Sequence, residues 1–159
     1  MSAQASINDI RSTLKHMESV DLMQLCLRMA RYKKDNKELL AYLLYEAQDE
    51  QQFIENKLEE MSVLFEELQD QGSYKLVKQI RKIGRWLSKP IKYSGLPGTQ
   101  AELLIHYCLH IKPWIKKKPK LNVLQTIYMQ QLKKIDAALA KLHEDLRGDY
   151  TKLRALLDS

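Results

Sequence analysis

The fold is decided by two consecutive stretches, IENKLEEMSVLFEEL at residues 54–68 and SYKLVKQIRKIGRWLSK at residues 73–89. In each stretch apolar side chains recur every three or four residues: Ile54, Leu58, Met61, Phe65 and Leu68 in the first, and Leu76, Ile80, Ile83 and Leu87 in the second. This spacing places them on one face of an α-helix. Because only a short polar segment around Gly72 separates the stretches, we expect two neighbouring antiparallel helices.

The same periodicity extends outward over nearly the whole chain. Ser6 followed by Asp9 predicts a capping box at the start of the first helix. A loop is expected at 90–98, a connector rich in Lys and Pro at 112–120, and one long helix from 121 to 147 that ends at Gly148. The sequence therefore predicts a single all-α domain over residues 1–159. It would hold about seven helices packed as antiparallel hairpins, in a compact bundle or a short irregular stack.

Glycine is too scarce for the common phosphate-binding and nucleophile motifs. The five glycines, at 72, 84, 95, 98 and 148, cannot form Gly-x-Gly-x-x-Gly, a phosphate loop or Gly-x-Ser-x-Gly. The chain also lacks Cys-x-x-Cys, His-Glu-x-x-His and Glu-x-x-His. We therefore expect a protein without enzymatic activity or cofactor, in which Gly84 permits close packing of the helix over 73–89.

Two features of the sequence bear on cellular location. No apolar run approaches the ~18 residues of a membrane span, and the first residues lack the basic start and apolar core of a secretory signal. We therefore expect a cytoplasmic protein without a membrane partner. Cys26 and Cys108 are expected to be buried free thiols, although a disulfide between them stays open.

One cluster has the residue types of a metal site. Glu102, His106 and His110 follow one another at intervals of four, so they share one helix face, and Cys108 lies nearby in sequence. They form the only polar stripe of an otherwise apolar helix, and solvent exposure is the simpler interpretation. A metal-dependent enzyme using His106 and His110, with His143 or Glu144 as a further ligand, stays a third hypothesis.

Charge is strongly segregated along the chain. Residues 38–70 hold ten acidic residues and one basic residue, whereas residues 71–134 hold fourteen basic residues and one acidic residue. On the helix over 73–89 the bases lie opposite the apolar side chains. We call them the basic face: Lys75, Lys78, Arg81, Lys82, Arg85 and Lys89. The connector adds Trp114, Lys116, Lys117 and Lys118.

Two interpretations of the basic face remain open. Basic side chains with interleaved aromatics suit a phosphate backbone and stacked bases, which predicts DNA or RNA binding through residues 74–89 and 112–120. Alternatively, the acidic helix at 50–70 neutralises the basic face by ion pairs. The carboxylates would be Glu55, Glu60, Glu66 and Glu67, and their partners Lys78, Arg81, Lys82 and Arg85.

The leading hypothesis is a non-enzymatic helical module that binds another protein, with nucleic-acid binding as the alternative. A second copy is one expected partner. A helix over 121–147 would be ~40 Å long, more than a domain of this size needs, and part of its apolar stripe would then be buried in a homodimer.

Two stretches resemble an uncharacterised family of small bacterial all-helical proteins. They are ELLAYLLYEA at residues 38–47 and LHEDL at residues 142–146. The resemblance implies no activity, cofactor or catalytic residue.

Overall fold

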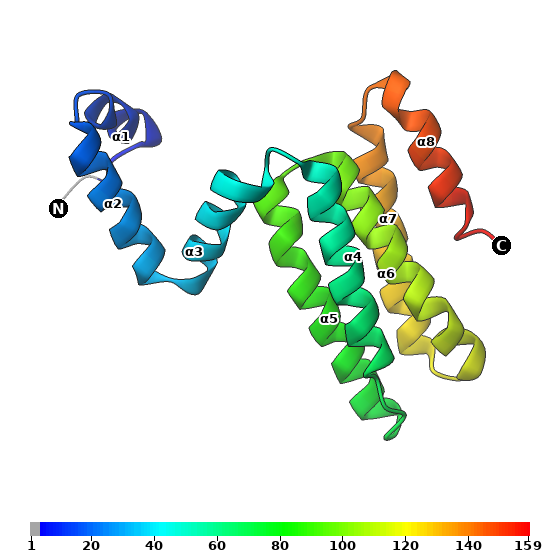
Figure 1. Ribbon diagram of the computed structural model, residues 1–159. Coiled ribbons are helices and arrows are strands. Elements are labelled where there is room, and N and C mark those ends of the chain that lie inside the picture. Colours follow the sequence, from blue (N-terminus) through cyan, green and yellow to red (C-terminus); the bar gives the residue numbers. More distant parts are fainter. Residues whose placement is uncertain (1–3) are drawn as a thin grey trace. The chain divides into compact units, whose positions relative to one another are not determined.

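The computed structural model describes residues 4–159, which contain eight α-helices and no strand (Figure 1). The helices are α1 (Ile7–Leu14), α2 (Ser19–Tyr32), α3 (Lys34–Ala41), α4 (Glu50–Glu66), α5 (Ser73–Ser94), α6 (Pro97–Lys117), α7 (Asn122–Ala140) and α8 (Glu144–Ala155). A π-helical segment, Tyr42–Glu46, lies between α3 and α4. The predicted all-α class is confirmed.

The described chain forms two compact units, residues 4–44 and residues 45–159. The boundary falls inside the π-helical segment. The expectation of a single domain over residues 1–159 stays a prediction.

The first unit contains α1, α2 and α3. Its start is the predicted capping box: the Ser6 side chain accepts a hydrogen bond from the Asp9 amide at 3.2 Å, and the Asp9 carboxylate accepts one from the Ser6 amide at 2.8 Å. The Asn36 side chain donates to the Met29 carbonyl at 2.9 Å and links α3 to the end of α2. Unusually for packed helices, none of the three contains a buried side chain.

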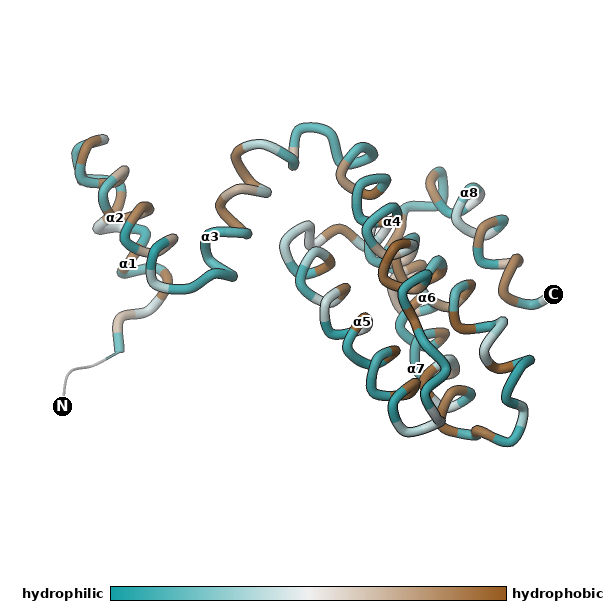
Figure 2. The backbone as a smooth tube through the Cα atoms, turned by 60° about the horizontal axis from the view of Figure 1, so that its bottom comes forward, coloured by the Kyte–Doolittle hydropathy of each residue, from teal (hydrophilic) through white to brown (hydrophobic). Residues whose placement is uncertain are grey.

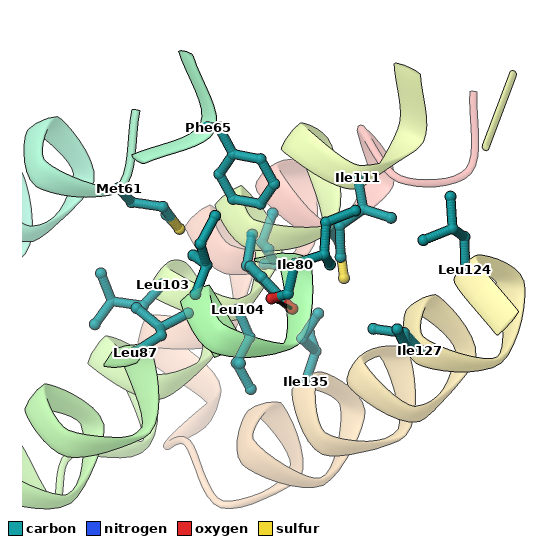
Figure 3. Close-up of a cluster of buried hydrophobic side chains, with 14 of the residues drawn as sticks. Met61, Phe65, Ile80, Leu87, Leu103, Leu104, Ile111, Leu124, Ile127 and Ile135 are labelled. Carbon is teal, nitrogen blue, oxygen red and sulfur yellow. Dashed lines mark hydrogen bonds between the residues drawn. The ribbon is translucent and has the colours of Figure 1, made fainter. Parts of the chain in front are cut away.

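The second unit is built around α6. This helix contacts α4, α5, α7 and α8, and α4 and α5 run antiparallel to each other as predicted (Figure 1). Along α5 the colour changes between hydrophobic and hydrophilic within the turns, as expected for a helix with one buried face (Figure 2). The side chains of α4 to α7 converge on one core (Figure 3). Its fully inaccessible members include Met61, Leu76, Ile80, Leu87, Leu103, Ile105, Ile111, Leu124 and Ile135.

The two non-helical segments predicted around prolines, residues 90–98 and 112–120, are shorter than expected. Helix α5 continues through Pro90 to Ser94, and α6 continues through Pro113 to Lys117. Proline removes one helical hydrogen bond, but Pro90 is buried and Ile91 packs against the core, so burial maintains the helix. The expected loop over 90–98 shrinks to Gly95, whose φ of +67° is left-handed, and Leu96. The expected connector over 112–120 shrinks to residues 118–121.

The turn between α5 and α6 is tied to the start of α4. Buried Thr99 donates a hydrogen bond to the Glu50 carboxylate at 2.6 Å, and the Ser94 hydroxyl donates to the same oxygen. The Glu50 carboxylate therefore joins three helices at one end of the second unit.

The long helix predicted over 121–147 is interrupted. Helix α7 ends at Ala140, and α8 begins at Glu144 with Gly148 in its interior. The Leu142 side chain is buried, and the His143 ring caps α8 by accepting a hydrogen bond from the Asp145 amide. Since α7 has 19 residues, about 28 Å, helix length no longer argues for a homodimer.

Gly84 of α5 packs closely against α6. An added Cβ at Gly84 would lie 2.8 Å from the Tyr107 hydroxyl oxygen, which confirms the predicted close packing.

Cys108 is a buried free thiol, and burial raises its pKa to about 12. Cys26 is also free but exposed, so its predicted burial is wrong. Residues on the first unit's helices lack the packing partners that bury Cys108.

Candidate functional site

The basic face lies on the solvent side of α5. Its six members are exposed, whereas the apolar stripe of the same helix is buried in the core. The segregation predicted from sequence thus places a row of cations on the surface of the second unit.

The ion pairs predicted between the acidic helix and Lys78, Arg81, Lys82 and Arg85 of this row do not form in the described residues. Within residues 4–159, no ion pair joins Glu55, Glu60, Glu66 or Glu67 to Lys78, Arg81, Lys82 or Arg85; the Glu60 carboxylate instead pairs with Lys57 at 2.8 Å. An apolar groove of about 520 Å³ separates the charges. Its lining includes Val63 and Leu64 of α4 and Trp86 of α5, with Glu67 and Lys82 also on it. The predicted neutralisation by these ion pairs is therefore wrong.

The basic residues at the end of α6 are partly engaged. The ammonium groups of Lys118 and Lys117 lie 2.8 and 3.5 Å from the Asp70 carboxylate, and the hydrogen bond from Lys118 holds the pKa of that carboxyl below its usual value. Lys117 also lies 5.0 Å from the centre of the Trp114 ring, which packs against the core. Lys116 is exposed. Asp70 thus brings the end of α6 close to the start of α5. Lys117 and Lys118 already pair with Asp70, and Trp114 already contacts Lys117 and the core.

A cleft of about 710 Å³ lies between α5, α6 and α7, and we call it the basic cleft. Its cations are Arg81, Arg85 and Lys92 from α5 and Lys134 from α7. Side-chain amides of Gln100, Gln130 and Gln131 also line it, together with Ser88. The remaining lining residues are Gly84, Ile91, Gly95, Leu104, Tyr107 and Ile127, so the lining contains no carboxylate.

The prediction from the sequence included two of the four cations of this cleft, Arg81 and Arg85. It omitted Lys92, because residues 90–98 were expected to form a loop, and it omitted Lys134 and the three glutamines of the lining. Lys133 and Lys134 form a visible basic pair in the sequence. Nothing in the sequence says that α5 and α7 line the same cleft, however, since α6 separates them along the chain.

The polar stripe of α6 is half-buried rather than exposed, so the predicted solvent exposure of Glu102, His106 and His110 is wrong. The stripe faces α4: the His110 ring stacks on Phe65, with centroids 4.7 Å apart and planes 8° apart. Helix α6 is enclosed by four neighbours, which leaves it no fully exposed face. In the part of the chain that the structure describes, no three His, Cys, Asp or Glu side chains are arranged to hold a metal ion. His143 and Glu144 are exposed at the start of α8.

Burial determines the ionisation of this stripe. Burial lowers the pKa of His106, and the neighbouring His110 lowers it further. Burial also lowers the pKa of His110, although the negative charge of Glu66 raises it in part. Burial and the nearby Glu55 raise the pKa of Glu102. All three groups are therefore biased toward their neutral forms.

The two histidines should make stability depend on pH. An unfolded histidine has a pKa near 6.5, whereas the pKa of these two histidines is lower in the folded chain. The unfolded chain therefore binds more protons than the folded chain as the pH falls from about 7. Stability consequently falls with the pH in this range. Glu102 has the opposite sign, because its raised pKa stabilises the fold at low pH. We expect the wild type to lose more unfolding free energy between about pH 7.5 and 5.5 than the His106→Gln/His110→Gln variant. Urea unfolding at both pH values measures this, with exposed His16→Gln as the control; equal losses in wild type and double variant would contradict it.

No protein-family model matches this chain, and neither a curated protein nor a solved structure shows significant similarity to it. Across residues 4–159 no helix combines the length and apolar character needed to cross a membrane.

Proposed function

We propose that this chain is a non-enzymatic helical interaction protein that binds another protein through α1, α2 and α3. The observation that carries the proposal is that these three helices contain no buried side chain. On α2 the apolar residues with helical spacing are Leu22, Leu25, Cys26, Met29 and Tyr32, which share one face, whereas Val20 and Met23 lie on the opposite side of the helix. Large apolar side chains that stay exposed include Ile7 (72%), Val20 (63%), Met23 (53%), Met29 (56%) and Tyr32 (79%).

Helix length strengthens this argument. The three helices have 8, 14 and 8 residues. Isolated helices shorter than ~12–15 residues are marginal in water, and most helical stability in proteins comes from packing an apolar face. Contiguous exposed apolar surface commonly marks an interaction site. A partner that covers this surface would supply the packing that the unit lacks.

The experiment replaces apolar side chains on one face of α2. Leu25→Gln/Met29→Gln, on the apolar stripe and both exposed in the free chain, should reduce recovery of a bound partner from native lysate at least about tenfold, since removing two side chains buried by the partner costs about 1.5–3 kcal/mol each. The polar variant Asp21→Gln/Arg28→Gln is the matched control on the same helix and should retain the partner. Light scattering of the purified chain tests whether the partner is a second copy.

Two results would overturn the proposal. One is equal recovery with the apolar variant and the control. The other is a wild-type chain that retains no protein from the lysate and stays monomeric at high concentration.

A second candidate function is binding of a polyanion, DNA or RNA, through the second unit. Its support is the basic face, of which Lys75, Lys78, Arg81, Lys82 and Arg85 have no ion-pair partner in the described structure. Such binding would weaken steeply with salt, because each neutralised phosphate releases counterions.

A metal-dependent enzyme at His106 and His110 gains no support, because the stripe packs against α4. A cytoplasmic location, the absence of a membrane partner and the family resemblance of residues 38–47 and 142–146 stay predictions.

A further inference from the structure

We propose that the basic cleft holds the phosphate backbone of a nucleic-acid strand between α5 and α7. Arg81, Arg85 and Lys92 would contact phosphates from one wall, and Lys134 from the other. The inference rests on the polyanion-binding function proposed above and moves its site away from the end of α6.

The wall formed by α5 has the shape of an extended ligand. Arg81, Arg85, Ser88 and Lys92 follow at steps of four, three and four residues, so they form one row that spans about 17 Å. Lys78 and Lys75 continue the row at steps of three, which lengthens it to about 26 Å. A small phosphorylated molecule would contact only part of this row, whereas a strand would use all of it.

The opposite wall adds a cation and neutral donors. Lys134 lies three and four residues after Gln131 and Gln130, so the three side chains share one face of α7 toward the cleft. Amide groups donate hydrogen bonds to phosphate and sugar oxygens, and such contacts position a nucleic acid without reading its sequence. Because no carboxylate lines the cleft, nothing in its lining repels a phosphate.

The floor of the cleft argues for contact with phosphates rather than with bases. Tyr107 is the only aromatic residue in the lining; it is buried, and its hydroxyl donates to the Ile80 carbonyl at 2.8 Å. Base stacking needs an accessible aromatic face. Leu104 and Ile127 are also buried, so the floor lacks the open apolar pockets that would anchor an acidic amphipathic helix. Binding should therefore depend little on base sequence.

The test measures fluorescence anisotropy of labelled single strands of about 20 nucleotides, RNA and DNA, with the full chain. The five cations of the row and Lys134 predict a salt slope near −4.2, so affinity should fall about 300-fold between about 50 and 200 mM salt. Homopolymer strands of different base should bind within about threefold of one another, since phosphates carry no base information.

Paired variants on α7 locate the site. Lys134→Gln should reduce the magnitude of the salt slope by about 0.7, whereas Lys133→Gln, one residue away and outside the lining, should change it much less. Gln130→Glu places a carboxylate in the cleft and should weaken binding about tenfold at low salt; Gln125→Glu, the same change elsewhere on α7, should weaken it no more than about twofold. All four side chains are exposed or at the surface, so circular dichroism should show intact helices.

Each result has a defined meaning. No binding at low salt overturns both the inference and the polyanion function. Binding that Lys133→Gln and Lys134→Gln weaken equally overturns the cleft but leaves the polyanion function. Displacement of the strand by inorganic triphosphate at equal phosphate concentration assigns the cleft to a small ligand, and displacement by polyglutamate assigns it to an acidic protein; either result overturns the nucleic-acid assignment.

Discussion

Leu103→Ala is expected to lower the free energy of unfolding of the second unit by about 2–5 kcal/mol. Leu103 is fully inaccessible on α6, the helix that contacts four others (Figure 3). Truncation removes apolar contacts and leaves a cavity that the enclosing helices cannot fill completely. Since small domains are stable by only ~5–15 kcal/mol, this single change would remove a large share of the total.

Tryptophan fluorescence during urea unfolding measures this effect in the intact chain. Both tryptophans, Trp86 and Trp114, lie in the second unit, so the signal reports that unit alone. Leu146→Ala on α8 is the matched control, because this leucine is 55% exposed and its truncation should cost less than about 0.5 kcal/mol. Similar losses in the two variants would contradict a core centred on α6.

Gly84→Ala is expected to destabilise the second unit by about 1–3 kcal/mol, although alanine is the better helix former by about 1 kcal/mol. The new Cβ would lie 2.8 Å from the Tyr107 hydroxyl oxygen and 3.3 Å from the ring carbon that carries it. The ring is buried and its hydroxyl is bonded to the Ile80 carbonyl, so it has little freedom to move. Steric overlap should therefore outweigh the gain in helix propensity.

A double-mutant cycle isolates this clash. In a Tyr107→Phe background the hydroxyl is gone, and the added methyl group should be nearly neutral; Tyr107→Phe by itself should cost about 0.5–1.5 kcal/mol for the lost hydrogen bond. Gly148→Ala in α8 is the control, because its Cβ would meet no atom within 4 Å and should stabilise by up to about 1 kcal/mol. Equal effects of Gly84→Ala in both backgrounds would show that the hydroxyl contact is unimportant.

Predictions from the sequence were most accurate where the controlling interactions are local. The Ser6–Asp9 capping box joins residues three apart, and the apolar stripes of α4 and α5 arise from spacing within each helix. These features depend on neighbours along the chain, so the sequence displays them directly. Exposure of the basic face on α5 followed in the same way, because the opposite side of that helix is strongly apolar.

Predictions failed where distant residues compete with local preference. Pro90 should end a helix by its own chemistry, yet α5 continues because Pro90 and Ile91 are packed by other helices. The stripe of Glu102, His106 and His110 looked exposed because polarity normally marks the solvent side of a helix. Its burial against Phe65 depends on the position of α4, which begins some fifty residues earlier.

By itself the sequence determined that the chain is helical, where most helices run and that acidic and basic residues are segregated, because periodicity and composition are properties of short segments. Only the tertiary structure decided which of those charges meet. It placed an apolar groove between the acidic helix and its basic neighbour, and it brought Lys134 opposite Arg81 and Arg85. It also left α1, α2 and α3 without a buried side chain. These outcomes depend on how the apolar faces of separate helices pack, and no single segment contains that information.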